Sequence, residues 1–218
     1  MNDNKIKVLN LYAGIGGNRK LWQNVEVTAV EINPEIAAIY QNFFPNDTVI
    51  VADAHKFLLE HYTEYDFIWS SPVCKTHSNC NHFLNAQGCV RYPEMTLYQE
   101  IILLKTWFKG TWVVENVISY YEPLIKPFQC ERHYFWCNFV ISKRKKDTTF
   151  TITNSRASTR RTIESYLSSL QKYHNIDLSY YDASTSKKIE YLANCVRPEL
   201  GNHVFKCAFK EKQTKLVG

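Results

Sequence analysis

No apolar run in the 218 residues approaches the roughly 20 that a membrane-spanning helix needs. The first residues, Met-Asn-Asp-Asn-Lys, lack the apolar core of a signal peptide. The seven cysteines are an odd number, and their spacing forms no compact disulfide framework. There is also no internal repeat. We therefore expect a cytoplasmic protein with reduced thiols.

What is present is ordinary for a globular chain: 45% of the residues are hydrophobic and 22% are charged. The length fits one domain, with or without a small appendage. Charge is divided unevenly. Residues 1–131 carry 10 Lys and Arg against 14 Asp and Glu, whereas residues 132–218 carry 16 against 7. The basic C-terminal part indicates a surface that faces a polyanion, although a solvated basic surface would look the same.

Apolar and β-branched runs alternate with helical periodicity over the first 117 residues, which predicts an α/β fold with a doubly wound, mostly parallel sheet. Residues 79–92 are polar with little periodicity, and we expect a mobile loop there. The predicted strands are 5–12, 25–32, 48–51, 66–70 and 111–117, and the predicted helices are a short stretch reaching Trp22, 34–43, 54–62 and 93–108.

The pattern changes after residue 132. Residues 133–141 are strongly β-prone, and a basic loop (SKRKK) follows at 142–146. Residues 148–153 are a candidate strand, while 160–174 and 184–194 predict two helices. Residues 197–202 lead into a last apolar stretch, 203–209, and the tail from 210 onward is expected to fray.

Three predicted strands end in side chains or turns suited to a nucleoside. The first ends in a Gly14-x-Gly16-Gly17 turn, where glycine lets the backbone approach a ligand beside a helix N-terminus. Arg19 stands where the full dinucleotide fingerprint has a third glycine. Glu31 ends the second strand, where an acid can bind ribose hydroxyls, and Asp53 follows the third, where it could accept from an adenine amino group.

The fourth and fifth predicted strands end in a thiol and a carboxylic acid. Cys74 follows the run Phe67–Pro72, and Glu115-Asn116 ends the next strand. In a parallel sheet both groups lie at one edge. Thiolate addition at C6 of cytosine, with a proton supplied at N3, makes C5 nucleophilic enough to accept a methyl group. The alternative is that Cys74 is a small apolar residue without a chemical role.

Seven short segments resemble, in order, the motifs of the DNA (cytosine-5) methyltransferase family. The similarity covers residues 5–141 and again 194–206. The segments are 11–17 (LYAGIGG), 31–33 (EIN), 53–54 (DA), 72–74 (PVC), 96–98 (TLY), 115–117 (ENV) and 201–204 (GNHV).

The resemblance implies S-adenosyl-L-methionine (AdoMet) as cofactor, double-stranded DNA as partner and the Rossmann-like fold of AdoMet-dependent methyltransferases. Residues 1–141 would form the catalytic domain, 142–194 a small basic region facing DNA, and 195–218 a closing segment with the tail. The residues expected to bind AdoMet are Tyr12, Ala13, Gly14, Gly16, Gly17, Glu31, Ile32, Asp53, Ala54, Pro72, Asn202 and Val204.

The resemblance also assigns catalytic roles. Cys74 is the nucleophile for a flipped-out cytosine, Glu115 protonates N3, and Asn116 positions the loop. The Gln-x-Arg-x-Arg motif of the family survives only as QCERH at 129–133, and Arg132 is the candidate for holding the base O2. Val73 separates the cysteine from its usual proline, and Lys75 replaces a glutamine, so an inactive relative is an alternative.

Little of the chain is left for target recognition, so we expect salt-sensitive DNA binding with a short recognition sequence or with specificity from a partner or second subunit. Restriction–modification, phage self-protection and orphan methylation all fit. Two further alternatives are methylation of cytosine in RNA and a zinc site on the loop, from Cys74, His77, Cys80, His82 and Cys89; otherwise no metal is expected. The expected DNA-binding residues are Lys75, Ser78, Lys143, Arg144, Arg156, Arg160 and Arg161.

Overall fold

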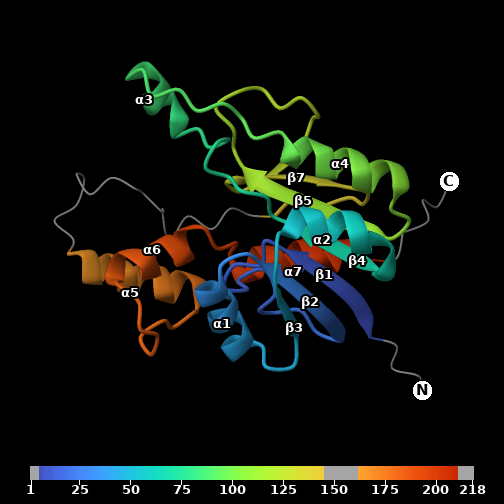
Figure 1. The fold of residues 1–218 in the computed structure, drawn as a ribbon, viewed down its shortest axis with the longest axis horizontal. Coiled ribbons are helices and arrows are strands. Elements are labelled where there is room, and N and C mark those ends of the chain that lie inside the picture. The colour runs from blue at the N-terminus through green and yellow to red at the C-terminus, as the bar shows by residue number, and fades with distance from the viewer. Residues whose placement is uncertain (1–4, 145–161, 211–218) are drawn as a thin grey trace, which may run out of the picture.

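A seven-stranded sheet in the order β3-β2-β1-β4-β5-β7-β6 forms the centre of the computed structural model, which describes residues 5–144 and 162–210 (Figure 1). Strands β1 to β5 pair in parallel, whereas β7 pairs antiparallel with β5 and β6 pairs antiparallel with β7. The prediction of an α/β, mostly parallel, doubly wound sheet is confirmed. The strands are β1 (Ile6–Leu11), β2 (Val25–Glu31), β3 (Thr48–Val51), β4 (Phe67–Ser70), β5 (Thr111–Val117), β6 (Phe128–Cys130) and β7 (His133–Cys137).

Successive side chains along each strand point to opposite faces of the sheet, and both faces are apolar. Helices therefore cover both faces. On one face, α2 (Ala54–His61) and α4 (Thr96–Trp107) pack in a core that includes Leu58 and Leu104. On the other, α7 (Pro198–Ala208) packs with Trp22 against β1 and β4. In the described part of the chain no helix combines the length and the apolar character needed to cross a membrane.

Helix α1 (Pro34–Phe43) begins as the sequence predicts, since Asn33 caps it and Pro34 occupies its first turn. Its outer side packs against α5 (Ile163–His174) and α6 (Thr185–Ala193) through a third apolar cluster containing Ile39 and Leu170. Figure 1 shows α5 and α6 beside α1.

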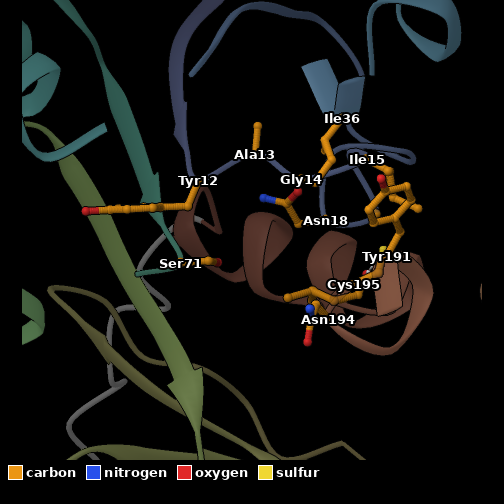
Figure 2. A pocket seen from close by; sticks show the side chains of 12 residues that line it. Tyr12, Ala13, Gly14, Ile15, Asn18, Ile36, Ser71, Tyr191, Asn194 and Cys195 are labelled. Carbon is orange, nitrogen blue, oxygen red and sulfur yellow. Dashed lines mark hydrogen bonds between the residues drawn. The ribbon is translucent and has the colours of Figure 1, made fainter. Parts of the chain in front are cut away.

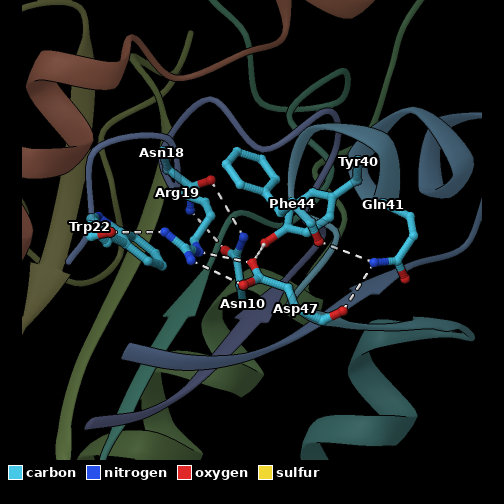
Figure 3. Close-up of polar contacts among 8 residues, drawn as sticks. All are labelled: Asn10, Asn18, Arg19, Trp22, Tyr40, Gln41, Phe44 and Asp47. Atoms are coloured by element: carbon cyan, nitrogen blue, oxygen red, sulfur yellow. Dashed lines mark hydrogen bonds and ion pairs between the residues drawn. The ribbon is translucent and has the colours of Figure 1, made fainter. Parts of the chain in front are cut away.

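The short helix predicted between the glycine turn and Trp22 is wrong: the chain makes turns there instead. Gly16 has φ +81°, outside the helical region, and Asn18 donates to Asn10 in β1 at 2.7 Å. Arg19 forms a bidentate ion pair with Asp47, at 2.8 and 3.0 Å (Figure 3). These side chains hold residues 14–22 in turns, so that stretch supplies no helix N-terminus beside the glycine loop.

Two further expectations need correction. The predicted loop 79–92 contains a helix, α3 (Asn81–Ala86), and a short 3-10 helix follows α2 at Tyr62–Glu64. The last apolar stretch, 203–209, is not separate but forms most of α7. The candidate strand 148–153 and the start of the helix expected from Arg160 lie outside the described residues.

Candidate active site

The nucleophile loop, which follows β4 and carries Cys74, is hydrogen-bonded to the neighbouring strand β5. Asn116 is 1% exposed, and its Nδ2 donates to the carbonyl of Pro72 at 3.0 Å. Its Oδ1 accepts from the backbone N–H of Val117 at 2.9 Å. Asn116 therefore sets the path of the chain two residues before Cys74, the positioning role expected of it from sequence.

Glu115 is a buried carboxyl group at the same sheet edge. Burial raises its pKa to about 7, against the opposing effects of a hydrogen bond from Ser71 and the charge of Arg132. A carboxyl group with this pKa carries a proton in a substantial fraction of molecules at neutral pH. It is thus suited to donate a proton to a base nitrogen.

Cys74 is a half-buried, free thiol whose charge interacts with Glu115. Burial, followed by the Glu115 charge, raises its pKa above the ordinary value, while Lys75 and Arg132 act in the opposite direction. The surroundings of Cys74 in the substrate-free chain therefore favour the protonated thiol. Desolvation of the thiol outweighs the two nearby cations.

Arg132 lies on the turn that joins β6 to β7, next to Glu131 in the left-handed conformation at φ 54°. Its charge lowers the pKa of both Cys74 and Glu115, and its Nη2 donates to the carbonyl of Ala193 at 3.3 Å. The structure therefore brings a thiol, a carboxyl group and a guanidinium to one edge of the sheet.

Two buried histidines lie close to this group, His133 beside Glu115 and His174 near Arg132, and the sequence indicated neither. His133 Nε2 is 3.8 Å from Glu115 Oε1, because β7 pairs His133 with Val117 on the same face of the sheet as Glu115. His174, from α5, is 0% exposed. Burial lowers the pKa of each to about 3, and the Arg132 charge adds to the effect, so both are neutral at pH 7.

A pocket opens next to this edge, between the glycine loop and the segment that follows α6. Figure 2 shows Ile36 and Tyr191 on one side of the pocket and Tyr12 and Ser71 on the other. Sequence reasoning identified the glycine-loop side but not the C-terminal side, which only the packing of α6 on α1 reveals. The lining residues are Tyr12, Ala13, Gly14, Ile15, Gly17, Asn18, Ile36, Ser71, Tyr191, Asn194, Cys195 and Val196.

Glu31 lies at the end of β2 with both oxygens already engaged by backbone amides. Oε2 accepts from Gly14 and Oε1 from Asn33, each at 3.0 Å. Each carboxylate oxygen keeps a second lone pair that a hydroxyl group can use. Ile32 beside it is 67% exposed, an apolar surface suited to a flat ring. Asp53 is exposed and caps α2 by accepting from Lys56, and Ala54 is buried under that cap.

Gly17 is required because the chain after α6 approaches it closely. A Cβ at this position would lie 1.9 Å from Cys195 Sγ and 2.4 Å from the carbonyl oxygen of Val196. Val204, which we expected to contact the cofactor, is fully buried in the core cluster that α7 forms against the sheet. Asn202 is likewise absent from the pocket lining, which residues 194–196 provide instead.

Glu100 in α4 is a second carboxyl group that the sequence did not reveal as important. It is 0% exposed and accepts hydrogen bonds from Tyr12 at 2.7 Å and Ser70 at 2.5 Å. His55 Nδ1 lies 3.1 Å away. One carboxylate thus joins the ends of β1 and β4 to α2, and it directs the Tyr12 ring away from the pocket.

The residues expected to bind DNA are differently placed. Lys75 pairs with Glu190 of α6 at 3.2 Å, and Arg144 pairs with Glu131 at 3.4 Å. Ser78 is half-buried and accepts from the N–H of Cys80, whereas Lys143 is exposed. The other three, Arg156, Arg160 and Arg161, lie outside the described residues.

The cysteines and histidines of the nucleophile loop do not converge on a metal-binding position. In the described ranges no three His, Cys, Asp or Glu side chains group as metal ligands. His77 is buried and its Nδ1 instead lies 2.6 Å from the Tyr121 hydroxyl.

The sequence matches no protein-family model and no curated protein. A solved structure of the Entamoeba histolytica methyltransferase EhMeth superposes over 95% of this chain and 100% of that chain, with TM-score 0.61 and 13% identity. A DNMT2 mutant from Spodoptera frugiperda is 26% identical over 52% of this chain and 36% of that chain, with TM-score 0.37. A SAM-dependent methyltransferase from Agrobacterium tumefaciens also has TM-score 0.37, with 16% identity over 59% and 42%. The superposition with EhMeth shows that this chain has the same Rossmann-like fold.

Proposed function

We propose that the chain is an AdoMet-dependent methyltransferase that modifies C5 of cytosine in DNA. The observation that carries the proposal is the convergence of Cys74, Glu115 and Arg132 at one sheet edge, beside a pocket formed by the glycine loop. The methyltransferase fold supports the general reaction, and the ordered family motifs support the cytosine substrate.

The pocket fits AdoMet in the residues it offers. Gly14 allows a ligand to lie against the backbone, Glu31 can accept from ribose hydroxyls, and the exposed Ile32 can pack on the adenine. Asp53 keeps one carboxylate oxygen for the adenine amino group. When bound, AdoMet supplies an electrophilic methyl group.

The residues then act on the base in a fixed order. Cys74 loses its proton to solvent water and its sulfur bonds to C6, while Glu115 passes a proton to N3, which turns the ring into an enamine nucleophilic at C5. Arg132 can hold O2 of the base. After C5 has gained the methyl group, a water molecule takes the C5 proton, which re-forms the 5,6 double bond and expels the Cys74 thiolate, and Glu115 takes back the N3 proton. The cytosine must leave the stack first, at a cost of a few kcal/mol.

The test is transfer of labelled methyl from AdoMet to DNA, with modified cytosines mapped by bisulfite sequencing. Cys74→Ser should abolish transfer and the covalent trap with 5-fluorocytosine DNA. Cys137→Ser is the matched control, because Cys137 lies on β7 and its thiol only donates to the carbonyl of Phe139. Undiminished transfer by Cys74→Ser would overturn the mechanism. Transfer to tRNA but not DNA would identify an RNA enzyme, and AdoMet binding without transfer an inactive relative.

A further inference from the structure

The segment that follows the nucleophile projects from the body of the protein as an arm, residues 79–92, which contains α3 (Figure 1). The 27 residues from Phe67 to Pro93, which include this arm, contain no Asp or Glu. Lys75 and Arg91 are the cations of this stretch. An acid-free projection in a chain with 21 acidic residues fits a polyanionic partner.

The base of the arm is held firmly. The N–H of Asn79 donates to the carbonyl of Ile118 at 3.1 Å, and Ser78 pairs with Ser119 in an antiparallel bridge. Tyr120 donates through its hydroxyl to the carbonyl of Arg91 at 2.9 Å, which fastens the far end of the arm to the same segment. These hydrogen bonds fix both ends of the arm to residues 118–120, where the sequence predicted a mobile loop.

The arm nevertheless exposes large apolar side chains. Phe83 of α3 is 77% exposed and Val90 55%, and Tyr92, which follows the anchored Arg91, is 82% exposed. The one residue that α3 buries is Asn81. Exposed aromatic rings on an acid-free element that carries an arginine form a surface on which unpaired bases can stack, since every base offers a π-face. Paired duplex presents its phosphates but keeps its base faces covered.

We propose that the arm stacks on unpaired bases of the nucleic acid next to the target cytosine, with Phe83 and Tyr92 as the stacking rings. This assignment rests on the proposed nucleic-acid substrate of the site. It adds a preference for an unpaired strand, which neither the pocket nor the Cys74–Glu115 pair supplies.

Binding of the full chain to fluorescent oligonucleotides tests the proposal without methyl transfer, so failure of the proposed chemistry does not affect it. Phe83→Ala and Tyr92→Ala should each weaken binding of single-stranded DNA by about 5- to 150-fold, the range measured for stacking of one base. Binding of a fully paired duplex should change by less than about 2-fold, since phosphate contacts dominate there. Tyr180→Ala, at a residue 92% exposed beyond α5, is the matched control and should change neither.

A 2-aminopurine placed beside the target cytosine gives a second measurement, because its fluorescence falls when it stacks on an aromatic ring. That quenching should disappear in Phe83→Ala. The same oligonucleotide in RNA form identifies the polymer that binds more tightly. Equal losses on paired and unpaired DNA, or no loss on either, would overturn the proposal. A change of oligomeric state in these variants with unchanged affinity for the oligonucleotides would also overturn it, and would assign the arm to self-association.

Discussion

At the residue scale, Cys74 and Glu115 hold their protons in the opposite order from the one that the proposed reaction needs. Burial raises the pKa of Glu115 to about 7 and that of Cys74 above its ordinary value. The reactive form pairs a thiolate with a protonated carboxyl group. Methyl transfer should therefore rise with pH, about tenfold per unit, until Glu115 begins to ionise near pH 7. Above that pH loss of the Glu115 proton cancels the gain in thiolate, and the rate should level.

Single-turnover rates between about pH 5.5 and 8.5 would show this profile. Glu115→Gln should remove the break near pH 7, because the amide does not titrate. A rate that kept rising about tenfold per unit through pH 8 in the unmodified protein would contradict the proton order.

His133 gives a second prediction, because a neutral imidazole faces the Glu115 carboxyl group at 3.8 Å. In His133→Arg a permanent cation would replace it and lower the Glu115 pKa by about one unit or more. The break in the pH profile should move to lower pH, and the rate at about pH 7.5 should fall about tenfold. His133→Gln keeps a neutral polar side chain and should leave the break in place. An unchanged break in a folded His133→Arg variant would show that His133 does not influence Glu115.

At the element scale, the contact between the glycine loop and the chain after α6 can be tested at Gly17. Gly17→Ala would force a methyl group against Cys195 and Val196, a clash expected to cost about 1–3 kcal/mol of stability. AdoMet affinity should fall as well, because residues 195–196 line the pocket. Calorimetry of unfolding and of AdoMet binding measures both effects.

Gly88→Ala serves as the control for that experiment. Gly88 has φ +80°, and no atom lies within 4 Å of the position that an alanine methyl group would take, so the cost is limited to backbone strain of about 1–2 kcal/mol. AdoMet affinity should be unchanged. Equal losses of AdoMet affinity in both variants would show that the contact between Gly17 and residues 195–196 does not support cofactor binding.

The parts of the fold that could be predicted are those with a local pattern. Buried runs such as 67–70 identify the five parallel strands, and Asn33-Pro34 marks the start of α1. The helix after the glycine turn failed because Arg19 reaches Asp47, 28 residues away, and no local pattern encodes that pair. His174 could not be predicted for the same reason, since only the packing of α5 brings it close to Arg132. The thiol and acid were predictable because both follow strands, whereas the far wall of the pocket depends on tertiary packing.

At the scale of the whole molecule, two lysines join the C-terminal helices to the N-terminal part of the chain. Lys187 of α6 pairs with Glu35 of α1 at 2.9 Å. Lys20, which follows the glycine loop, donates to the carbonyl of Asn175 at the end of α5. These contacts hold α5 and α6 beside the pocket that we propose for AdoMet. The expected DNA-facing role of residues 142–194 stays a prediction, which falls mainly on residues outside the described ranges.

The stability of the folded protein should depend on pH through His174. Its pKa in the folded protein is about 3, below the ordinary value of 6.5, because burial and the charges of Arg132, Arg197 and Lys20 oppose protonation. A depressed pKa means that the unfolded chain binds the proton more tightly. The stability that neutral His174 contributes is therefore complete above pH 6.5 and is lost as pH falls towards 3, by about 1.4 kcal/mol per unit.

His174→Gln removes this titration while it keeps a neutral polar side chain. Urea unfolding of both proteins at about pH 7.5, 6.5, 5.5 and 4.5 isolates the contribution, since His133 and Glu115 titrate in both and cancel in the difference. The free energy of unfolding of the unmodified protein relative to His174→Gln should be constant above pH 6.5. It should then fall by about 1.4 kcal/mol for each unit below. A difference that stayed constant down to about pH 4.5 would mean that His174 takes up a proton without opening the core, and would exclude the dry environment that the packing of α5 gives it.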